Sequence, residues 1–277
     1  MQKLYSIQTA DRVFETGGSR PVLLSCNDMN SYVCKYATGR SAAVRLMCEF
    51  IGASFLKIWG LNVPDFALIS VKREHIPSEF NINAYYFDTT CFGLQYSRTF
   101  AEVIDFTANI SSQQRRNFPN RKDLLYIALF DIWLANDDRN QGNYNLLVDT
   151  ENQRNFIPID HETILNTCNI NIPICEITYE DSIINSPLFQ KLFNDNELNK
   201  SSLAEIRDNF FNKVKHCQEN TVELISQLPS DWNINKSELE TKLIDEIFVD
   251  SWLEGSFNLF LEFLQRNINT KENASAL

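Results

Sequence analysis

Short apolar runs separated by turn residues fill the first third of the chain. Two such runs in "RVFETGGSRPVLLSC" (residues 12–26) flank the Gly17-Gly18 pair, and "SYVCKYATG" (31–39) follows with the alternation of a strand. Residues 41–60 instead place apolar side chains at steps of three and four, which predicts one helix. Two further strands are predicted, over residues 61–74 and 83–97. The expected order is β-β-β-α-β-β, an antiparallel sheet carrying one helix.

The remainder of the chain has a mainly helical pattern. "RKDLLYIALFDIWLA" (121–135) predicts a strongly apolar helix, and "NYNLLVD" with "NFIPIDHETIL" predicts a short strand hairpin over 143–165. After residue 178 the pattern predicts three amphipathic helices, over residues 186–193, 202–228 and 237–267. A run of strands followed by a run of helices indicates the α+β class.

The composition predicts a globular protein that neither inserts into a membrane nor binds nucleic acid. The chain of 277 residues is 44% hydrophobic and contains 20 Phe, which is enough for a full core. The longest unbroken apolar run, "LLYIALF", is far too short to cross a bilayer, and the N-terminus shows no signal-peptide pattern. The net charge of -11 argues against a nucleic-acid surface. One basic cluster, residues 114–122, is either a solvated loop or a docking patch.

The cysteines and histidines bear on the compartment and on metal binding. The seven Cys form no CxxC pair, and an odd number in a chain with no secretion signal predicts free thiols in a reducing, cytoplasmic environment. The three His, at positions 75, 161 and 216, form no cluster that would hold zinc.

A dense polar stretch, "WLANDDRNQGNYN" (133–145), begins where the apolar helix stops. Within it Asp138 and Asn143 stand five residues apart, and Asp160 follows seventeen residues later at the end of the apolar run "FIPID". Phosphoryl transfer uses an Asp to orient the attacking hydroxyl, and it uses an Asn and a second Asp to hold Mg²⁺, which prefers oxygen ligands. This order and spacing are those of protein kinases.

Two upstream residues fit the same chemistry. Lys35 lies in the third predicted strand, after the glycine-containing turn, and Glu49 lies in the helix that follows. A lysine in this place can contact phosphates, and a glutamate on the next helix can hold it. Each element alone is commonplace, since a strand lysine is usually solvated and "DDRN" is usually a turn. The combination in the correct order makes coincidence improbable.

With these motifs the chain resembles the HipA-like kinases, in the compact form without a separate N-terminal subdomain. The similar segments are "GGS", "YVCKY", "RLMCEFIGASFLKIWGLNVPDFALISV", "WLANDDRNQGNYNLLV", "FIPIDHETIL" and a helical tail with "LPSDW". "DRNQGN" is also similar to the DRxxxN loop of type II phosphatidylinositol 4-kinases. The resemblance implies a bilobal, protein-kinase-like fold, with a small N-lobe over residues 1–97 and a larger, mainly helical C-lobe over 98–277.

The resemblance implies ATP and Mg²⁺ as the bound cofactors. Lys35, paired with Glu49, would contact the α- and β-phosphates, and the loop of Gly17, Gly18 and Ser19 would cover them. Some toxin-type relatives are silenced by phosphorylation of a serine in this loop. Ser19 is therefore either a comparable regulatory site or an ordinary turn serine.

The same resemblance assigns the reacting groups. Asp138 would be the catalytic base, Asn143 and Asp160 would bind Mg²⁺, and Gln95 and Tyr96 would lie near the adenine-binding hinge.

The chain also departs from the family pattern. Toxin-type members carry a His where this chain has Asn140, and Asp160 is followed by His161 and Glu162 and not by Phe-Gly. These departures leave the inherited substrate choice open.

Several neighbouring residues have two interpretations. Arg139 either bridges the loop to nearby carboxylates or contacts phosphate, and His161 is a hydrogen-bonded structural residue in preference to a catalyst. Asp137 is the lesser candidate for the base, because it stands six residues from Asn143. Asn145 assists Asp138 or serves the turn, and Tyr96 stacks on adenine or packs in the core.

The sequence therefore favours an ATP- and Mg²⁺-dependent serine/threonine protein kinase, with an unidentified protein substrate and a cognate regulatory protein as its partners. Two alternatives stay open: a kinase for a small molecule or lipid on the same scaffold, and a catalytically inactive kinase-like interaction module. The retained Lys35, Asp138, Asn143 and Asp160 argue against the inactive module. The lack of a basic amphipathic helix or lipidation signal argues against a lipid substrate.

Overall fold

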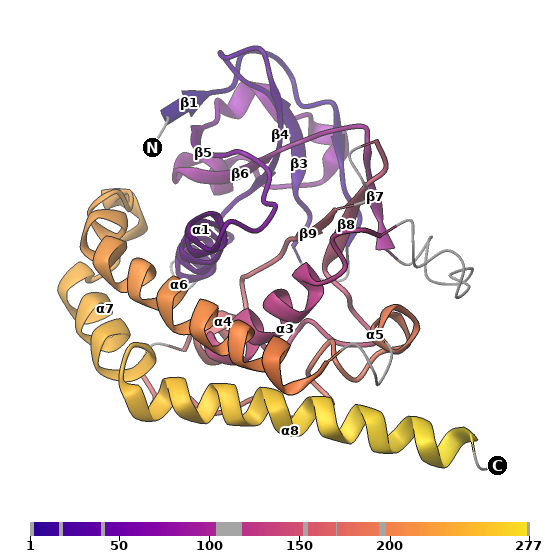
Figure 1. Cartoon of the computed structure of the whole chain (residues 1–277). Helices are drawn as coiled ribbons and strands as arrows, with labels where there is room; N and C mark the ends of the chain where they lie inside the picture. Colours follow the sequence, from indigo (N-terminus) through magenta and orange to yellow (C-terminus); the bar gives the residue numbers. More distant parts are fainter. Residues whose placement is uncertain are drawn as a thin grey trace.

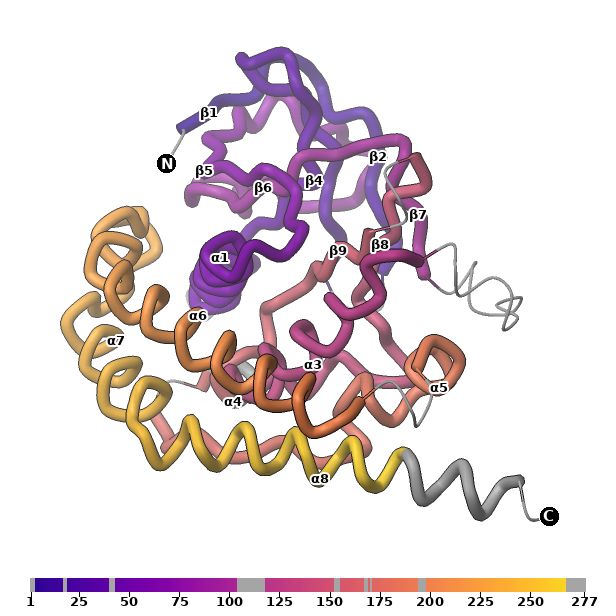
Figure 2. Tube along the Cα trace, in the orientation of Figure 1, coloured from indigo at the N-terminus to yellow at the C-terminus, as the bar shows by residue number. Residues whose placement is uncertain are grey.

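The computed structural model describes residues 3–16, 19–39, 42–103, 118–151, 155–169, 171–193 and 198–275. Strands from the first part of the chain gather at one end, and long helices from the last part cover the other end (Figure 1). The tube view shows a second, smaller group of strands where the two parts meet (Figure 2). The architecture is therefore the bilobal α+β arrangement that we predicted.

A six-stranded mixed sheet forms the N-terminal part. Its strands run in the order β1-β5-β6-β4-β3-β2. Their bounds are β1 (Lys3–Tyr5), β2 (Arg12–Val13), β3 (Val22–Ser25), β4 (Ser31–Lys35), β5 (Phe66–Ser70) and β6 (Cys91–Gln95). All neighbouring pairs are antiparallel except β1 and β5, which are parallel. The prediction of a purely antiparallel sheet missed β1, because three residues are too few to show an alternating pattern.

One helix packs on this sheet, as predicted. α1 (Ala42–Trp59) carries fully buried apolar residues and lies between the sheet and the C-terminal helices (Figure 1). The strand predicted over 83–97 is wrong in its first half, where the chain forms the 3₁₀ helix η3 (Ala84–Asp88) before β6. The side chain of Asn83 accepts a hydrogen bond from the backbone amide of Tyr85 and so starts this turn. Two shorter 3₁₀ helices, η1 (Arg73–His75) and η2 (Ser78–Phe80), precede it.

The predicted hairpin is present as part of a three-stranded antiparallel sheet. It consists of β8 (Leu146–Asp149) and β9 (Phe156–Pro158), and a third strand, β7 (Phe100–Glu102), pairs with β8. This small sheet lies at the junction of the two parts (Figure 2). β8 begins directly after the polar stretch, and β9 ends two residues before Asp160.

Helices make up the rest of the C-terminal part. They are α3 (Asp123–Trp133), α4 (Ile164–Cys168), α5 (Pro187–Leu192), α6 (Lys200–Ser226), η5 (Ser230–Trp232), α7 (Lys236–Lys242), η6 (Leu243–Ile247) and α8 (Asp250–Ser275). The single helix predicted over 237–267 is interrupted, because η6 is a π-helical turn between α7 and α8. Among the described residues, none of the helices is both long enough and apolar enough to cross a membrane.

Aromatic packing joins α1 to the C-terminal helices. The ring of Trp133 on α3 stacks on Phe55 and on Trp59 of α1, with ring centroids 5.5 Å apart in each pair. The indole nitrogen of Trp133 donates to the carbonyl oxygen of Ile247 over 2.8 Å, so the ring also fixes the π-helical turn. The Lys213 ammonium on α6 donates to the carbonyl oxygen of Trp59 and caps the end of α1. These contacts fix the position of α1 relative to α3.

The cysteines match the expectation of free thiols only in part. The described free thiols are Cys26, Cys34, Cys91, Cys175 and Cys217. Cys48, buried on α1, is instead disulfide-bonded, so the expectation is wrong at that position.

Trp133→Ala should destabilise the whole fold. Truncating a buried Trp removes its apolar contacts and leaves a cavity, which costs about 3–5 kcal/mol in the free energy of unfolding. Urea denaturation followed by circular dichroism measures this cost. Met29→Ala is the control, since Met29 is 81% exposed and should change stability by less than about 0.5 kcal/mol. Equal midpoints for the two variants would contradict the central place of the Trp133 contacts.

Candidate active site

The polar loop, which we define as residues 134–145, connects α3 to β8. Ala135 and Asn145 adopt left-handed backbone angles, with φ of 50° and 44°, and these allow the chain to turn sharply at both ends. In the middle, Asn140 and Asn143 exchange backbone hydrogen bonds of 3.0 and 3.2 Å. The side chain of Asn140 accepts a further hydrogen bond from the amide of Gly142 over 2.9 Å. The crowded short polar residues therefore make a tight, self-bonded turn.

Arg139 holds this loop from the inside. Its side chain is fully buried, and its Nε donates to Asp131 of α3 over 2.9 Å. Its remaining nitrogens donate to the carbonyl oxygens of Tyr144, Asn145 and Ile159. The structure therefore supports the first interpretation of Arg139, a bridge between the loop and a carboxylate. Asp131 was overlooked, although a lone carboxylate inside "LLYIALFDIWLA" was a signal of a buried partner.

The carboxylate of Asp138 is fixed by two amides. Asn143 donates to Oδ2 over 3.0 Å, and Asn145 donates to the same oxygen over 3.1 Å. An asparagine has both a donor and an acceptor, so Asn143 can hold Asp138 and still present its carbonyl oxygen to a cation. Asn145 therefore contacts Asp138 and also forms part of the turn, and its assistance to a catalytic base stays a prediction. Asp137, the lesser candidate for the base, is exposed and is not among the described residues of the cleft.

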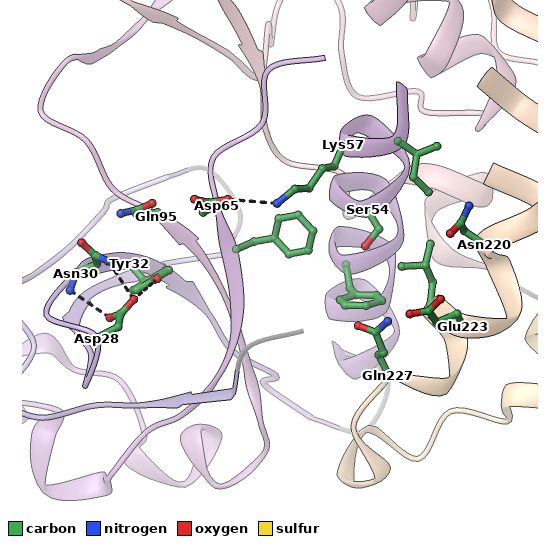
Figure 3. Close-up of a pocket in the computed structure, with 14 residues that line it drawn as sticks. Asp28, Asn30, Tyr32, Ser54, Lys57, Asp65, Gln95, Asn220, Glu223 and Gln227 are labelled. Atoms are coloured by element: carbon green, nitrogen blue, oxygen red, sulfur yellow. Dashed lines mark hydrogen bonds and ion pairs between the residues drawn. The ribbon is translucent and has the colours of Figure 1, made fainter. Parts of the chain in front are cut away.

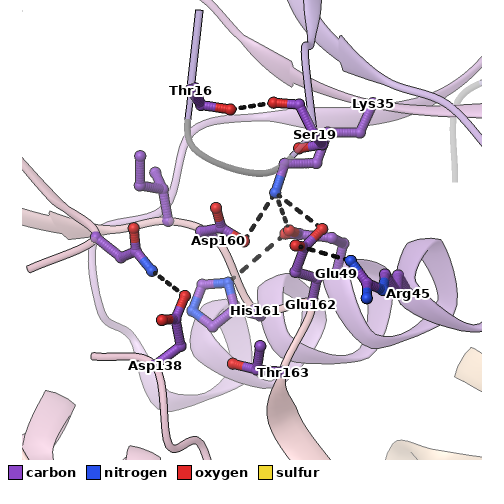
Figure 4. Close-up of polar contacts among 12 residues, drawn as sticks. Thr16, Ser19, Lys35, Arg45, Glu49, Asp138, Asp160, His161, Glu162 and Thr163 are labelled. Atoms are coloured by element: carbon purple, nitrogen blue, oxygen red, sulfur yellow. Dashed lines mark hydrogen bonds and ion pairs between the residues drawn. The ribbon is translucent and has the colours of Figure 1, made fainter. Parts of the chain in front are cut away.

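Lys35 on β4 lies among three carboxylates. Its ammonium pairs with Oε1 of Glu49, lies 2.9 Å from Oδ1 of Asp160 and lies 3.9 Å from Oε2 of Glu162 (Figure 4). The expected contact between Lys35 and Glu49 is therefore present. Glu162 was not predicted as a site residue, and it is also 3.5 Å from the guanidinium of Arg45.

Burial and charge shift the ionisation of this cluster in opposite directions. Burial disfavours the ammonium of Lys35, but Glu49, Asp160 and Glu162 outweigh it and raise the pKa of Lys35. Burial raises the pKa of Glu49 to about 7, against the opposing effect of Lys35. Asp160 is also desolvated, yet Lys35 outweighs the burial and lowers its pKa. Lys35 is therefore the permanent cation of the cluster.

Asp160 follows β9 in a left-handed backbone conformation, with φ of 60°. Such a conformation is uncommon outside glycine, although Asp tolerates it better than most residues. Glu49, Asp160 and Glu162 each offer a ligand atom, and these atoms all lie within 4.8 Å of one another. An all-oxygen donor set suits a hard divalent cation such as Mg²⁺.

A cleft of about 550 Å³ opens beside this cluster. Its described lining includes four predicted site residues, namely Ser19, Asp138, Asn143 and Asp160. It also includes residues that the sequence analysis did not single out for the site, namely Glu15, Thr16, Glu102, Val103, Tyr144, Leu146, Leu147, Ile159 and Glu162. Asp138 and Asn143 come from the polar loop and Asp160 from the segment after β9, and the fold brings them to one cavity.

The predicted hinge residues Gln95 and Tyr96 are not among the described residues of this lining. Gln95 lines a separate cavity of about 570 Å³ between the sheet, α1 and α6 (Figure 3). Tyr96 accepts a hydrogen bond of 3.0 Å from Arg12. Glu102 and Val103, a few residues further along, occupy the cleft instead. Gly17 and Gly18 lie outside the described residues.

His161 is buried, as its structural interpretation expects. Its Nε2 lies 3.1 Å from a guanidinium nitrogen of Arg139. Burial and the charge of Arg139 lower its pKa well below the ordinary value, so the ring is neutral.

Arg139→Met should destabilise the protein strongly, because it leaves the Asp131 carboxylate buried without its cation. Breaking a buried pair from one side costs about 3–5 kcal/mol. Adding Asp131→Leu to this variant should recover part of that loss, because no unpaired charge then remains in the core. Urea unfolding of the two single variants and the double variant gives the coupling energy. Purely additive losses would show that the pair is not a unit.

The fold and the sequence of this chain are similar to those of known kinases. The crystal structure of the Helicobacter pylori proinflammatory kinase CtkA is similar in fold, with a TM-score of 0.54 at 13% identity, covering 98% of this chain and 99% of that chain. The open conformation of CtTel1 matches at a TM-score of 0.31 and 8% identity, covering 94% of this chain and 12% of that one, which is too weak to support any inference. No curated protein sequence matches the chain. The family model described as HipA-like kinase matches residues 7–255, and the chain therefore belongs to the HipA-like kinase family.

Proposed function

We propose that this kinase transfers the γ-phosphoryl group of ATP, with Mg²⁺, to serine or threonine hydroxyls of a protein. One observation carries the proposal: a single cleft is lined by Asp138, Asn143 and Asp160, and the ion pair of Lys35 and Glu49 adjoins Asp160. These are the groups that phosphoryl transfer needs, since catalysis of this reaction is mainly positioning and charge stabilisation.

Asp138 orients the attacking hydroxyl. Asn143 and Asn145 both donate to its Oδ2, so the carboxylate has a fixed direction before the substrate arrives. Such a carboxylate accepts the proton that the hydroxyl gives up as it attacks phosphorus. The leaving group is ADP.

Lys35 places the phosphates. Glu49 is 1% exposed and holds the ammonium from the side of α1, so the cation stays in position when phosphate oxygens approach. Asp160 and Asn143 would hold Mg²⁺, and Glu162 would offer a further oxygen at the same place. When bound, Mg²⁺ neutralises charge on the phosphate oxygens.

The chemical class of the phosphate acceptor can be identified by following labelled phosphate from ATP into its product. Incubation with Mg²⁺ and γ-labelled ATP, followed by separation of protein, lipid and small molecules, should place the label on serine or threonine of protein. Label in lipid or a free metabolite would instead support the alternative substrate classes, including the likeness to type II phosphatidylinositol 4-kinases. No transfer to any acceptor would support the inactive interaction module.

The regulatory expectations stay part of this proposal. Ser19 lines the cleft, and a phosphate there would add about -1.5 to -2 charges where ATP phosphates bind. We propose that such a phosphate would exclude nucleotide. A cognate regulatory protein and a cytoplasmic location are proposed from the sequence alone.

Asp138→Asn should abolish turnover while keeping nucleotide binding. The amide is nearly isosteric but cannot accept the proton, and a general base contributes typically ~10²–10⁴-fold to the rate. Phosphoryl transfer and the Kd for ATP are measured on the same preparation. Asp137→Asn is the matched control and should keep wild-type turnover. If the two variants had the same activity, the role of Asp138 as base would be refuted.

Asp160→Asn and Asn143→Ala should fail in a different way. Each weakens the oxygen donor set for Mg²⁺, so the Mg²⁺ concentration needed for half-maximal rate should rise. Excess Mg²⁺ should partly rescue Asn143→Ala and should not rescue Asp138→Asn. A Mg²⁺ titration of the transfer rate for each variant measures this. An unchanged Mg²⁺ requirement in both metal-site variants would remove them from the proposed cation site.

Mg-ATP should raise the melting temperature of the wild type. A ligand that binds only the native state at a hundredfold excess over its Kd contributes roughly 2.7 kcal/mol. Lys35→Met should reduce the shift, because it removes the cation beside the cleft. Lys57→Met on α1 should leave the shift intact, since Lys57 is exposed and pairs with Asp65. Differential scanning fluorimetry gives all three shifts, and none in the wild type would contradict nucleotide binding.

A further inference from the structure

His161 connects the polar loop to α1 through both nitrogens of its ring. The ring is almost fully buried, with Nε2 3.1 Å from a guanidinium nitrogen of Arg139. Its Nδ1 lies 3.9 Å from Oε2 of Glu49 (Figure 4). A guanidinium only donates hydrogen bonds, so Nε2 must be the acceptor. The neutral ring therefore carries its hydrogen on Nδ1, the nitrogen that faces Glu49.

One carboxylate oxygen of Glu49, Oε2, can accept a hydrogen bond from this nitrogen. The other oxygen, Oε1, pairs with Lys35, while Oε2 is buried and makes no hydrogen bond of ordinary length in the described part of the chain, although the backbone amide of His161 lies near enough to help lower the pKa of Glu49. A buried carboxylate oxygen without a donor is costly, and Nδ1 of His161 is the ring nitrogen that faces it. The separation of 3.9 Å is too long for a hydrogen bond. Contacts of this kind commonly shorten when substrate binds.

The backbone of α1 is shaped to bring these groups together. Gly52 lies one turn after Glu49 on the same face of the helix, and a Cβ at Gly52 would lie 2.6 Å from Cβ and 2.7 Å from Cγ of His161. These distances are shorter than any real contact, so the absence of a side chain at Gly52 lets α1 touch His161 directly. Gly255 on α8 offers a contrast, because its nearest neighbour would be 3.7 Å away.

We propose that His161 is a positioning residue that sets the Lys35–Glu49 pair from the polar loop. Arg139 of the loop fixes the ring through Nε2. When nucleotide binds, Nδ1 closes the 3.9 Å gap and donates to Oε2 of Glu49, which then directs Lys35 toward the nucleotide. The inference rests on the proposed function, because the pair acts on ATP. In this chain, the residue that follows Asp160 would therefore orient the Lys35–Glu49 pair.

Three substitutions separate the two ring contacts. His161→Leu keeps an apolar filling but removes both nitrogens, His161→Asn keeps a donor near the place of Nδ1, and His161→Gln keeps an acceptor near the place of Nε2. Calorimetric titration with Mg-ATP should show the Kd of His161→Leu raised by roughly tenfold or more, as loss of a supporting residue behind a ligand does. His161→Asn should recover most of the affinity, and His161→Gln should not.

The KM for ATP and the kcat of the same variants should also separate a positioning role of His161 from a purely structural one. Because Lys35 contacts ATP both before and during transfer, His161→Leu should raise the KM for ATP more than it lowers kcat. Gly52→Ala should reproduce the rise in KM with His161 intact, while the matched Gly255→Ala should not. A purely structural role would lower the melting temperature of the His161 variants and leave KM and Kd unchanged.

The outcomes are distinguishable. A Kd for His161→Leu or Gly52→Ala within twofold of wild type overturns the inference, and so does recovery by His161→Gln without recovery by His161→Asn. Absence of phosphoryl transfer by the wild type would refute the proposed function instead, and the Kd series would still test His161. If His161→Leu fails to fold, the Asn and Gln variants with Gly52→Ala decide the matter.

Discussion

The buried guanidinium of Arg139 is the interaction on which the geometry of the site depends. Taking a cation out of water costs several kcal/mol, and the cost is offset only when its donors are satisfied. Here the acceptors are Asp131 on α3, two carbonyl oxygens of the polar loop and the carbonyl oxygen of Ile159, just before Asp160. Since these partners come from three separate segments, satisfying one side chain fixes how those segments meet. The placement of Asp138 and Asp160 at one cleft follows from that demand.

A second constraint is the imbalance of charge around Lys35. Three carboxylates, those of Glu49, Asp160 and Glu162, face the ammonium group of Lys35, and the guanidinium of Arg45 adds one further cation beside Glu162, so that acidic groups outnumber basic groups in the cluster. Like charges at this range repel unless cations screen them, so the arrangement favours binding of a divalent cation. A phosphate group, by contrast, would be repelled from the same place without that cation. The charge pattern thus fits a site that takes nucleotide and metal together.

The strand predicted over residues 83–97 was wrong in its first half, because a local side-chain hydrogen bond favours a turn that the apolar pattern did not show. Tyr85 and Phe87 suggested a strand, but the Asn83 side chain starts a 3₁₀ turn there. The resemblance to the HipA-like kinases placed Gln95 and Tyr96 near the adenine-binding hinge, and that placement stays a prediction; the described cleft lining contains Glu102 and Val103. The boundary between the lobes at residue 97 stays a prediction.

By itself the sequence determined the α+β class, the positions of α1, α3 and the hairpin, and the residues Lys35, Glu49, Asp138, Asn143 and Asp160 as candidates. Periodicity and the spacing of polar residues are local properties, so they can be seen in one chain. The tertiary structure alone decided that Arg139 is structural, that Asn145 and Asn143 share one oxygen of Asp138, and that Glu162 joins the cluster at Lys35. Those facts depend on which side chains meet across more than a hundred residues or around a left-handed turn. Burial and distance in space decide them, and neither is encoded in the spacing of residues along the chain.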